Sequence, residues 1–464
     1  MPKPNTEPTT STPLWITHGT LLTQNNDREV LQAHLEVRDG RIHAFHSWDT
    51  PVPEGVEHIN ARDLVITPGF IQPHIHLCQT LFRNMADDLE LLDWLSQRIW
   101  PFEAAHNAES MYLSAQLGIH ELLTSGTTTL LDMASIRHTD QVLEAVKDSG
   151  IRANVGKCLM DHPETCPSYL IEDTDSALTE ARELLSTWHG QANDRIRVSF
   201  APRFVVSCTE NLLKQVRDLS EEHNVIIHTH SSENQKEVEL VRDLVGQENA
   251  AYLHDIGLMS ERLVLAHCIW LNDTETRYIR DTGTHVTHCP SSNMKLASGF
   301  AKVPEMLESG INVGLAADGA PCNNTLDAFQ EMRLAGLIHK PRCGPRSMPA
   351  QQVLDMATRN GAKALGWFDD IGSLEVGKWA DLAVLDLNQV SNLRPHSTTT
   401  VPSAESLASA IVYATQPQQV RLTLVAGEVV AKDGKATRIP TEHIAASRVR
   451  QVQADLLERT KDFM

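Results

Sequence analysis

The feature that most constrains the fold is an alternation of short apolar runs with amphipathic stretches through the middle of the chain. TTTLLDM is followed by DQVLEAVKDSG, RIRVSFAP by ENLLKQVRDLSEEHN, and RLVLAHC by DTETRYIRDTG. This order is typical of strands and helices around a parallel sheet, either a closed barrel or an open doubly wound sheet. Polar residues stand at the carboxyl end of each successive apolar run. This favours the barrel, because the active site of a barrel is built from the ends of many strands. The sequence therefore predicts an α/β fold with a (β/α)8 TIM barrel.

Both ends of the chain have a different texture, in which alternating segments are separated by turn residues. Asp39-Gly40 divides LEVRDGRIHAF, and Asp433-Gly434 divides EVVAKDGKA, as the turns of tight hairpins do. We expect the two ends to form a β-sandwich that flanks the barrel. The predicted units are a disordered tail at 1–12, the β-sandwich at 13–67 and 375–440, the barrel at 68–374 and a C-terminal helix at 441–464.

The composition indicates which kinds of partner the protein binds and where in the cell it works. The formal charge of −20 disfavours nucleic acid, because phosphate binding needs clustered Lys and Arg. No stretch approaches the roughly 18 apolar residues that indicate a membrane span. The 8 cysteines form no CxxC pair, which favours reduced thiols in the cytoplasm. We expect a cytoplasmic protein that binds a small molecule and neither nucleic acid nor membrane, with a flexible Ser-, Thr- and Pro-rich loop at 388–403.

Histidines stand at the ends of several predicted strands. His74 and His76 are two residues apart, so on an extended strand both side chains point the same way and can bind one ion. One His-x-His pair is weak evidence, and the pattern recurs at 228–230. Later runs end in a further histidine or an aspartate, which completes the nitrogen and oxygen ligands that zinc or iron accepts. The predicted ligands of one divalent ion, zinc before iron, are His74, His76, His230, His267 and Asp318.

Three more positions suit the handling of protons. Glu233 comes three residues after His230, where a carboxyl group could project into the mouth of the barrel and deliver a proton. Asp318 beside a metal could accept a proton from the attacking water. His288 ends the next run and could hydrogen-bond the reacting centre. The predicted catalytic residues are therefore Glu233, Asp318 and His288.

Five ordered motifs together resemble the amidohydrolase superfamily, in its branch of amino-heterocycle deaminases and chlorohydrolases. The motifs are PGFIQPHIH, HTHSSEN, LAHC, HCPSSNMKLASG and GLAADGAPCNN, followed by GSLEVGKWADLAVLD. The resemblance implies a (β/α)8 barrel with a β-sandwich from both chain ends, the five metal ligands above, and Glu233 and His288 as catalysts. It also implies hydrolysis of an amino group off a nitrogen heterocycle, with release of ammonia. We expect the chain to form a homo-oligomer, a dimer.

Within that branch, two substrate classes are indicated. APRFVVSC and HSSENQKEVE resemble guanine deaminases, in which an Arg and a Gln contact the purine; here these are Arg203 and Gln79. A guanidinium can donate two hydrogen bonds to an oxo-purine edge. By this resemblance we favour guanine or a related oxo-aminopurine or pterin as substrate.

Other segments resemble deaminases of S-adenosylhomocysteine, methylthioadenosine and 5′-deoxyadenosine. LLDWLSQRIWPFEAAH places Glu103 where those enzymes hold ribose hydroxyls, with Trp100 nearby. They usually carry Arg where this chain has Lys157, and His where it has Arg203. The predicted substrate-binding residues are therefore Gln79, Arg203, Glu103, Trp100 and Lys157. An adenosine derivative or an s-triazine is the alternative substrate, and a non-catalytic barrel scaffold is a third hypothesis from another class.

Overall fold

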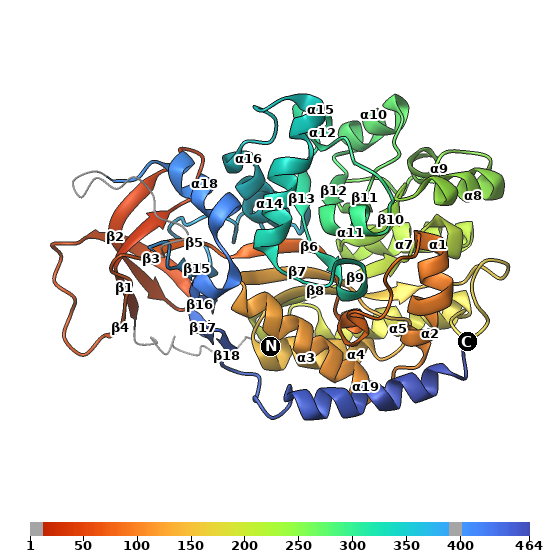
Figure 1. Cartoon of the computed structure of the whole chain (residues 1–464), viewed down its shortest axis with the longest axis horizontal. Coiled ribbons are helices and arrows are strands. Elements are labelled where there is room, and N and C mark those ends of the chain that lie inside the picture. The colour runs from red at the N-terminus through yellow and green to blue at the C-terminus, as the bar shows by residue number, and fades with distance from the viewer. Residues whose placement is uncertain (1–12, 389–400) are drawn as a thin grey trace, which may run out of the picture.

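A computed structural model describes residues 13–388 and 401–464. The predicted tail at 1–12, and most of the predicted loop at 388–403, lie outside the described residues. The described chain forms a nine-stranded parallel sheet surrounded by helices, and a second nine-stranded sheet at one end of the molecule (Figure 1). The predicted α/β barrel with a flanking β unit from both chain ends is confirmed.

The parallel sheet closes through a divided last strand. β13 pairs with β12, whereas β14, which begins three residues after β13 ends, pairs with β6 at the other edge of the sheet. Closure brings the carboxyl ends of all the strands to one mouth. The strands, in their order along the chain, are β6 Phe70–His76, β7 Thr127–Met133, β8 Arg152–Leu159, β9 Ile196–Pro202, β10 Ile227–Ser231, β11 Leu263–His267, β12 His285–His288, β13 Val313–Leu315 and β14 Asp318–Gly319.

The second sheet joins the two ends of the chain, since β5 pairs with β15. Its red and blue strands lie side by side in Figure 1. Both Asp-Gly pairs form the predicted hairpin turns: Asp39 and Gly40 have φ of 49° and 77°, and Asp433 and Gly434 have 47° and 75°. The strands are β1 Leu14–Leu22, β2 Val30–Arg38, β3 Arg41–Ser47, β4 Glu57–Asn60, β5 Val65–Pro68, β15 Leu382–Leu385, β16 Val420–Val425, β17 Glu428–Lys432 and β18 Lys435–Ala436.

Helices follow the barrel strands and carry clear start and stop signals. Asn234 begins α8 and Asn272 begins α10, each with a capping box. Gly246 and Gly283 end the same helices with φ of 74° and 71°. The longer helices are α3 Ala108–Thr124, α4 Thr139–Ser149, α5 Thr174–Trp188, α7 Glu210–His223, α8 Gln235–Val245, α9 Asn249–Asp255, α10 Asp273–Thr282, α14 Ala328–Ile338, α18 Ala404–Ala414 and α19 Ala446–Thr460.

The remaining helical segments are shorter, and two sets of them run on without a break, over residues 91–104 and 350–364. They are η1 Leu77–Phe82, α1 Leu91–Trp94, η2 Leu95–Ile99, α2 Trp100–Ala104, α6 Gln191–Asp194, η3 Val205–Ser207, α11 Pro290–Lys295, α12 Val303–Glu308, α13 Ala320–Asn323, α15 Lys340–Cys343, α16 Ala350–Asp355, η4 Met356–Asn360, α17 Gly361–Ala364 and η6 Pro417–Gln419. Among the described residues, no helix is both long and apolar enough to cross a membrane.

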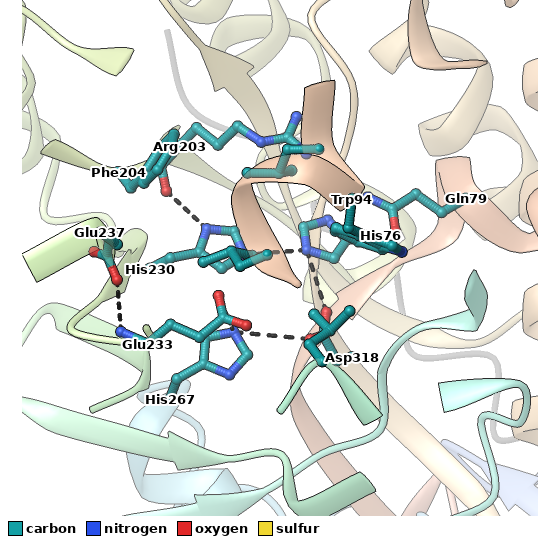
Figure 2. Close-up of a pocket in the computed structure, with 13 residues that line it drawn as sticks. His76, Gln79, Trp94, Arg203, Phe204, His230, Glu233, Glu237, His267 and Asp318 are labelled. Atoms are coloured by element: carbon teal, nitrogen blue, oxygen red, sulfur yellow. Dashed lines mark hydrogen bonds and ion pairs between the residues drawn. The ribbon is translucent and has the colours of Figure 1, made fainter. Parts of the chain in front are cut away.

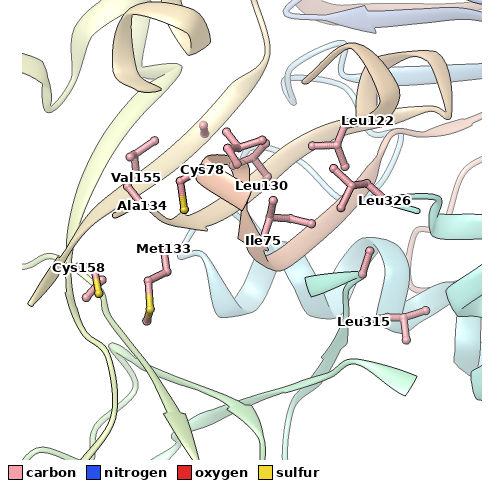
Figure 3. Close-up of a cluster of buried hydrophobic side chains, with 14 of the residues drawn as sticks. Ile75, Cys78, Leu122, Leu130, Met133, Ala134, Val155, Cys158, Leu315 and Leu326 are labelled. Carbon is pink, nitrogen blue, oxygen red and sulfur yellow. The ribbon is translucent and has the colours of Figure 1, made fainter. Parts of the chain in front are cut away.

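The alternation of side chains along β6 separates the core from the site. Ile75 belongs to a buried apolar cluster with Leu130 of β7, Val155 of β8 and Leu122 of α3 (Figure 3). Its two neighbours, His74 and His76, therefore point to the opposite side of the strand. Burial of the apolar layer fixes the direction in which both histidines project.

Candidate metal-dependent active site

Five side chains from four strands meet at the mouth of the barrel. His74 Nε2 lies 3.1 Å and His76 Nε2 3.4 Å from Asp318 Oδ1. His76 Nε2 lies 3.3 Å from His230 Nε2, and His267 Nε2 lies 3.7 Å from Asp318 Oδ2. Figure 2 shows four of these side chains converging at one end of a cavity. The structure thus brings together all five predicted ligands.

Backbone carbonyl groups fix two of the four imidazole rings. The Nδ1–H of His76 donates to the carbonyl oxygen of Met133 at 2.9 Å, and that of His230 donates to the carbonyl oxygen of Arg203 at 2.7 Å. Because a carbonyl oxygen only accepts, the proton of each neutral ring lies on Nδ1. The Nε2 lone pairs of both rings are therefore directed at the cluster.

Side chains fix the other two rings. His74 Nδ1 lies 2.7 Å from Nε2 of His228, and His267 Nδ1 lies 2.8 Å from Oδ1 of Asn293. His74 Nε2 and His267 Nε2 are buried and have no hydrogen-bond partner. Buried ring nitrogens normally find a partner, so these two indicate a ligand between them. Outer hydrogen bonds of this kind orient metal-ligating histidines.

Asp318 is held by its own loop. Ser292 Oγ donates to Asp318 Oδ2 at 2.7 Å, and the Gly319 N–H donates to Asp318 Oδ1. The backbone of Asp318 has φ of 66°, and that of His267 has 73°, a conformation that non-glycine residues adopt at a cost of about 1–3 kcal/mol. Burial would raise the pKa of Asp318, but the surrounding histidines, His74 first, hold it well below its ordinary value.

The donor set fits a divalent metal ion. The candidate ligand atoms fall into two groups, in each of which all atoms lie within 4.8 Å of one another. Four neutral imidazole nitrogens and one carboxylate are ligands that zinc accepts. The residues that would hold the ion are those of the two groups, His74, His76 and His230 in one, and His74, His267 and Asp318 in the other.

Glu233 lines a cavity beside this cluster. Its Oε2 lies 3.5 Å from His267 Nε2, and Ser298 Oγ donates to its Oε1 at 3.5 Å. The backbone N–H of Glu233 donates to Glu237 Oε2 at 2.6 Å, which fixes the turn after β10 (Figure 2). Burial raises the pKa of Glu233 to about 7, so the carboxyl group can hold a proton near neutral pH.

Three of the predicted substrate-binding residues form one buried network. Arg203 donates from both terminal nitrogens to Glu103, at 2.7 and 3.2 Å, and Gln79 Nε2 donates to Glu103 Oε1 at 2.9 Å. Burial opposes charge on both partners, yet their attraction raises the pKa of Arg203 and lowers that of Glu103. Arg203 and Gln79 line the cavity, and Gln79 Oε1 is buried with no hydrogen-bond partner.

Three predicted site residues do not reach the cavity. Lys157 is buried elsewhere, with its Nζ bonded to the carbonyl oxygen of Ile136 and paired with Glu172 at 2.9 Å and Glu180 at 3.2 Å. Trp100 is buried but does not line the cavity. His288 has both ring nitrogens buried without partners and packs near His339, with ring centroids 5.5 Å apart. None of these three side chains lines the cavity.

The structure also adds residues that sequence reasoning missed. His228 is the first member of the recurrent His-x-His pair, and it orients a ligand instead of serving as one. Ser292 and Asn293 belong to the HCPSSN motif, whose position directly after a strand was the available signal. Trp94 lines the cavity in place of Trp100. Trp94 and Trp100 lie six residues apart on one helical segment, and nothing in the sequence indicates which of them lines the cavity.

Comparisons with known proteins agree with this geometry. The profile of the amidohydrolase family matches residues 65–430. A 5-methylthioadenosine/S-adenosylhomocysteine deaminase from Syntrophobacter fumaroxidans is 39% identical over 95% of this chain and 97% of its own. The zinc-bound crystal structure of an adenosine deaminase from Xanthomonas campestris has a TM-score of 0.87 at 30% identity, covering 96% of this chain and 98% of that one.

A guanine deaminase from E. coli is more distant, with a TM-score of 0.81 at 25% identity over 91% of this chain and 100% of that one. The family profile spans most of the chain, and the Syntrophobacter relative covers nearly all of it. The chain therefore belongs to the amidohydrolase family, as a hydrolase that acts on carbon–nitrogen bonds.

Proposed function

We propose that this chain is a metal-dependent hydrolytic deaminase that removes the amino group of an adenosine derivative as ammonia. The observation that carries the proposal is the cluster of four imidazoles and Asp318, with the buried carboxyl group of Glu233 beside it. The Nε2 atoms of three imidazoles lie near Asp318, and that of His230 lies beside His76. One divalent ion, zinc in the first place, would supply Lewis-acid activation of a water molecule. Side chains of the protein would carry out the proton transfers.

Glu233 and Asp318 take opposite proton roles. Glu233, with its pKa raised by burial to about 7, can donate its proton to a ring nitrogen and recover one from the new hydroxyl group when ammonia leaves. Asp318, whose pKa is held low, is charged and can accept a proton from the attacking water and pass it to the departing amine. Two carboxyl groups with pKa values driven apart are typical of an acid and base pair. Leu91, Trp94 and Leu95 line the cavity with apolar surface, which would limit the water beside the reacting groups.

The names of the relatives with higher identity favour an adenosine derivative over guanine. Glu103, which is held by Arg203 and Gln79, is a carboxylate that could accept hydrogen bonds from ribose hydroxyls. Guanine stays the second candidate, because Gln79 and Arg203 line the cavity and Arg203 directs only two of its five N–H donors at Glu103.

The test is ammonia release by the zinc-loaded chain from adenosine, 5′-deoxyadenosine, 5′-methylthioadenosine, guanine and melamine. We expect release from the adenosine compounds, and loss of at least about 100-fold in kcat with Glu233→Gln, because general acid catalysis contributes about 10²–10⁴-fold. Glu239→Gln, at an exposed position on α8, is the matched control and should leave kcat unchanged. Release from guanine alone would refute the substrate, and full activity of Glu233→Gln would refute the mechanism.

A further inference from the structure

One buried carboxyl group outside the cavity has no counter-ion. Glu331 lies on α14 and is fully buried, and it forms an ion pair with none of the Lys, Arg or His side chains that the structure describes. Its burial raises the pKa of Glu331 to about 7. A buried carboxyl group in such a place is stable only when hydrogen-bond partners surround it. Those partners show which parts of the chain Glu331 connects.

Three donors converge on the two oxygens of Glu331, and they come from two loops. Ser291 donates its backbone N–H to Oε2 at 3.1 Å and its hydroxyl group to Oε1. Asn323 donates from Nδ2 to Oε1 at 2.9 Å. Ser291 belongs to α11, which follows β12, and Asn323 belongs to α13, which follows β14. One carboxyl group thus joins the loops after two strands of the barrel.

The contact with Ser291 takes the place of an N-cap. α11 begins at Pro290, and the side chain of Cys289 at the N-cap position makes no hydrogen bond to the helix. The first N–H groups of a helix have no partner within it, and Glu331 accepts the one that belongs to Ser291. Glu331 therefore fixes the position at which this short helix begins.

The two residues after Ser291 contact the ligand cluster. Ser292 Oγ donates to Asp318 Oδ2 at 2.7 Å. Asn293 Oδ1 lies 2.8 Å from His267 Nδ1. A shift of α11 would therefore move the hydrogen-bond partners of two ligand residues together.

The second loop carries Asp318 itself. Asn323 Nδ2 donates both to Glu331 and to the carbonyl oxygen of Ala317, the residue before Asp318, at 2.7 Å. Asp318 has φ of 66°, and a non-glycine residue keeps such a conformation only when its surroundings hold it there. The hydrogen bonds of Asn323 are part of what holds it.

We infer that Glu331 is a positioning residue of the metal site, which ties the loops after β12 and β14 together so that Asp318 and His267 are directed at the ion. The inference rests on the proposed function, because it concerns the ion that the deamination requires. Glu331 does not line the cavity, so it acts on the site through Ser292 and Asn293. Groups that orient metal ligands typically change metal affinity by about 10–100-fold.

The test is Glu331→Gln, which keeps the size of the side chain and replaces one accepting oxygen by an amide nitrogen that donates. In this variant an NH2 group faces a donor from one of the two loops, so the two loops are no longer held together. We expect the Kd of zinc, measured by competition with a chromophoric chelator, to rise by at least about tenfold. The visible absorption of cobalt(II) bound in place of zinc should change as well, since it depends on the geometry of the ligands.

Asp381→Asn is the matched control, because it makes the same change from a buried carboxylate to an amide outside this network. Asp381 pairs with Arg152 at the first residue of β8. The control should lower the free energy of unfolding and leave the Kd of zinc and the cobalt absorption unchanged. A folded Glu331→Gln chain with the zinc Kd and cobalt absorption of the unchanged chain would overturn the inference and leave the proposed function intact. Failure of the unchanged chain to bind zinc would overturn both.

Asn323→Ala tests the network from its other loop and keeps Glu331. The Kd of zinc should again rise, by at least about threefold, which is the scale of one lost hydrogen bond. Folding is checked by circular dichroism. An unchanged zinc Kd in folded Asn323→Ala would contradict the inference even if Glu331→Gln does not fold.

Discussion

Replacing His228 by alanine removes the hydrogen-bond partner of His74 without changing any residue that lines the cavity. His74 Nδ1 lies 2.7 Å from His228 Nε2, and both side chains are fully buried. For His74 to bind an ion through Nε2, its proton must lie on Nδ1 and be accepted by His228. In His228→Ala, this buried N–H has no acceptor and the ring loses its fixed orientation.

The expected loss follows from that geometry. An orphaned buried donor costs about 1–3 kcal/mol. Loss of a partner that orients a metal-ligating histidine typically lowers metal affinity by about 10–100-fold. That fold-change corresponds to about 1.4–2.8 kcal/mol, so the two ranges agree. We therefore expect the zinc affinity of His228→Ala to be about 10–100-fold lower than that of the unchanged chain.

The assay is competition for zinc between the protein and a chromophoric chelator, with folding checked by circular dichroism. His228→Gln is the matched control, because its amide oxygen can still accept the proton and should recover most of the affinity. A purely structural role for His228 would lower the free energy of unfolding of the metal-free chain and leave zinc affinity unchanged. Zinc binding by folded His228→Ala as tight as that of the unchanged chain would refute the reasoning.

Three further predictions concern stability. Arg152 and Asp381 form a buried ion pair at 2.7 Å, and Asp381→Asn leaves Arg152 charged without its partner. The free energy of unfolding, measured in urea, should therefore fall by about 3–5 kcal/mol. A fall of less than about 1 kcal/mol would contradict this. Asn272→Ala removes the capping box of α10 and should cost about 1 kcal/mol in the same assay, whereas a neutral result would mean that the cap is dispensable. Zinc at about 100 times its Kd should stabilise the chain by about 2.7 kcal/mol, seen as a higher Tm that chelation reverses; an unchanged Tm would argue against a metal site.

Local patterns made much of the architecture predictable. The Asp39-Gly40 and Asp433-Gly434 hairpins follow from turn chemistry that involves only adjacent residues. The convergence of His74, His230 and Asp318 follows from strand ends in a closed barrel, once that fold is assumed. The first inference needs only neighbouring residues, and the second needs only the alternation of strands and helices with the barrel that it predicts.

Pairings across long sequence distances could not be predicted in the same way. Glu103 and Arg203 are 100 residues apart, and no local pattern tells that each satisfies the other. Their pairing places an internal ion pair at the residue expected to contact guanine. Lys157 meets Glu172 and Glu180 from a neighbouring loop and helix, so a strand-end lysine does not reach the cavity. These outcomes depend on tertiary distances and not on residue type.

The most direct test of the central claim is a measurement of kcat/KM for ammonia release from 5′-methylthioadenosine and from guanine by the same zinc-loaded preparation. The account predicts turnover of the nucleoside, little or no turnover of guanine, and loss of nucleoside turnover in Glu233→Gln. Efficient turnover of guanine with none of the nucleoside would contradict it.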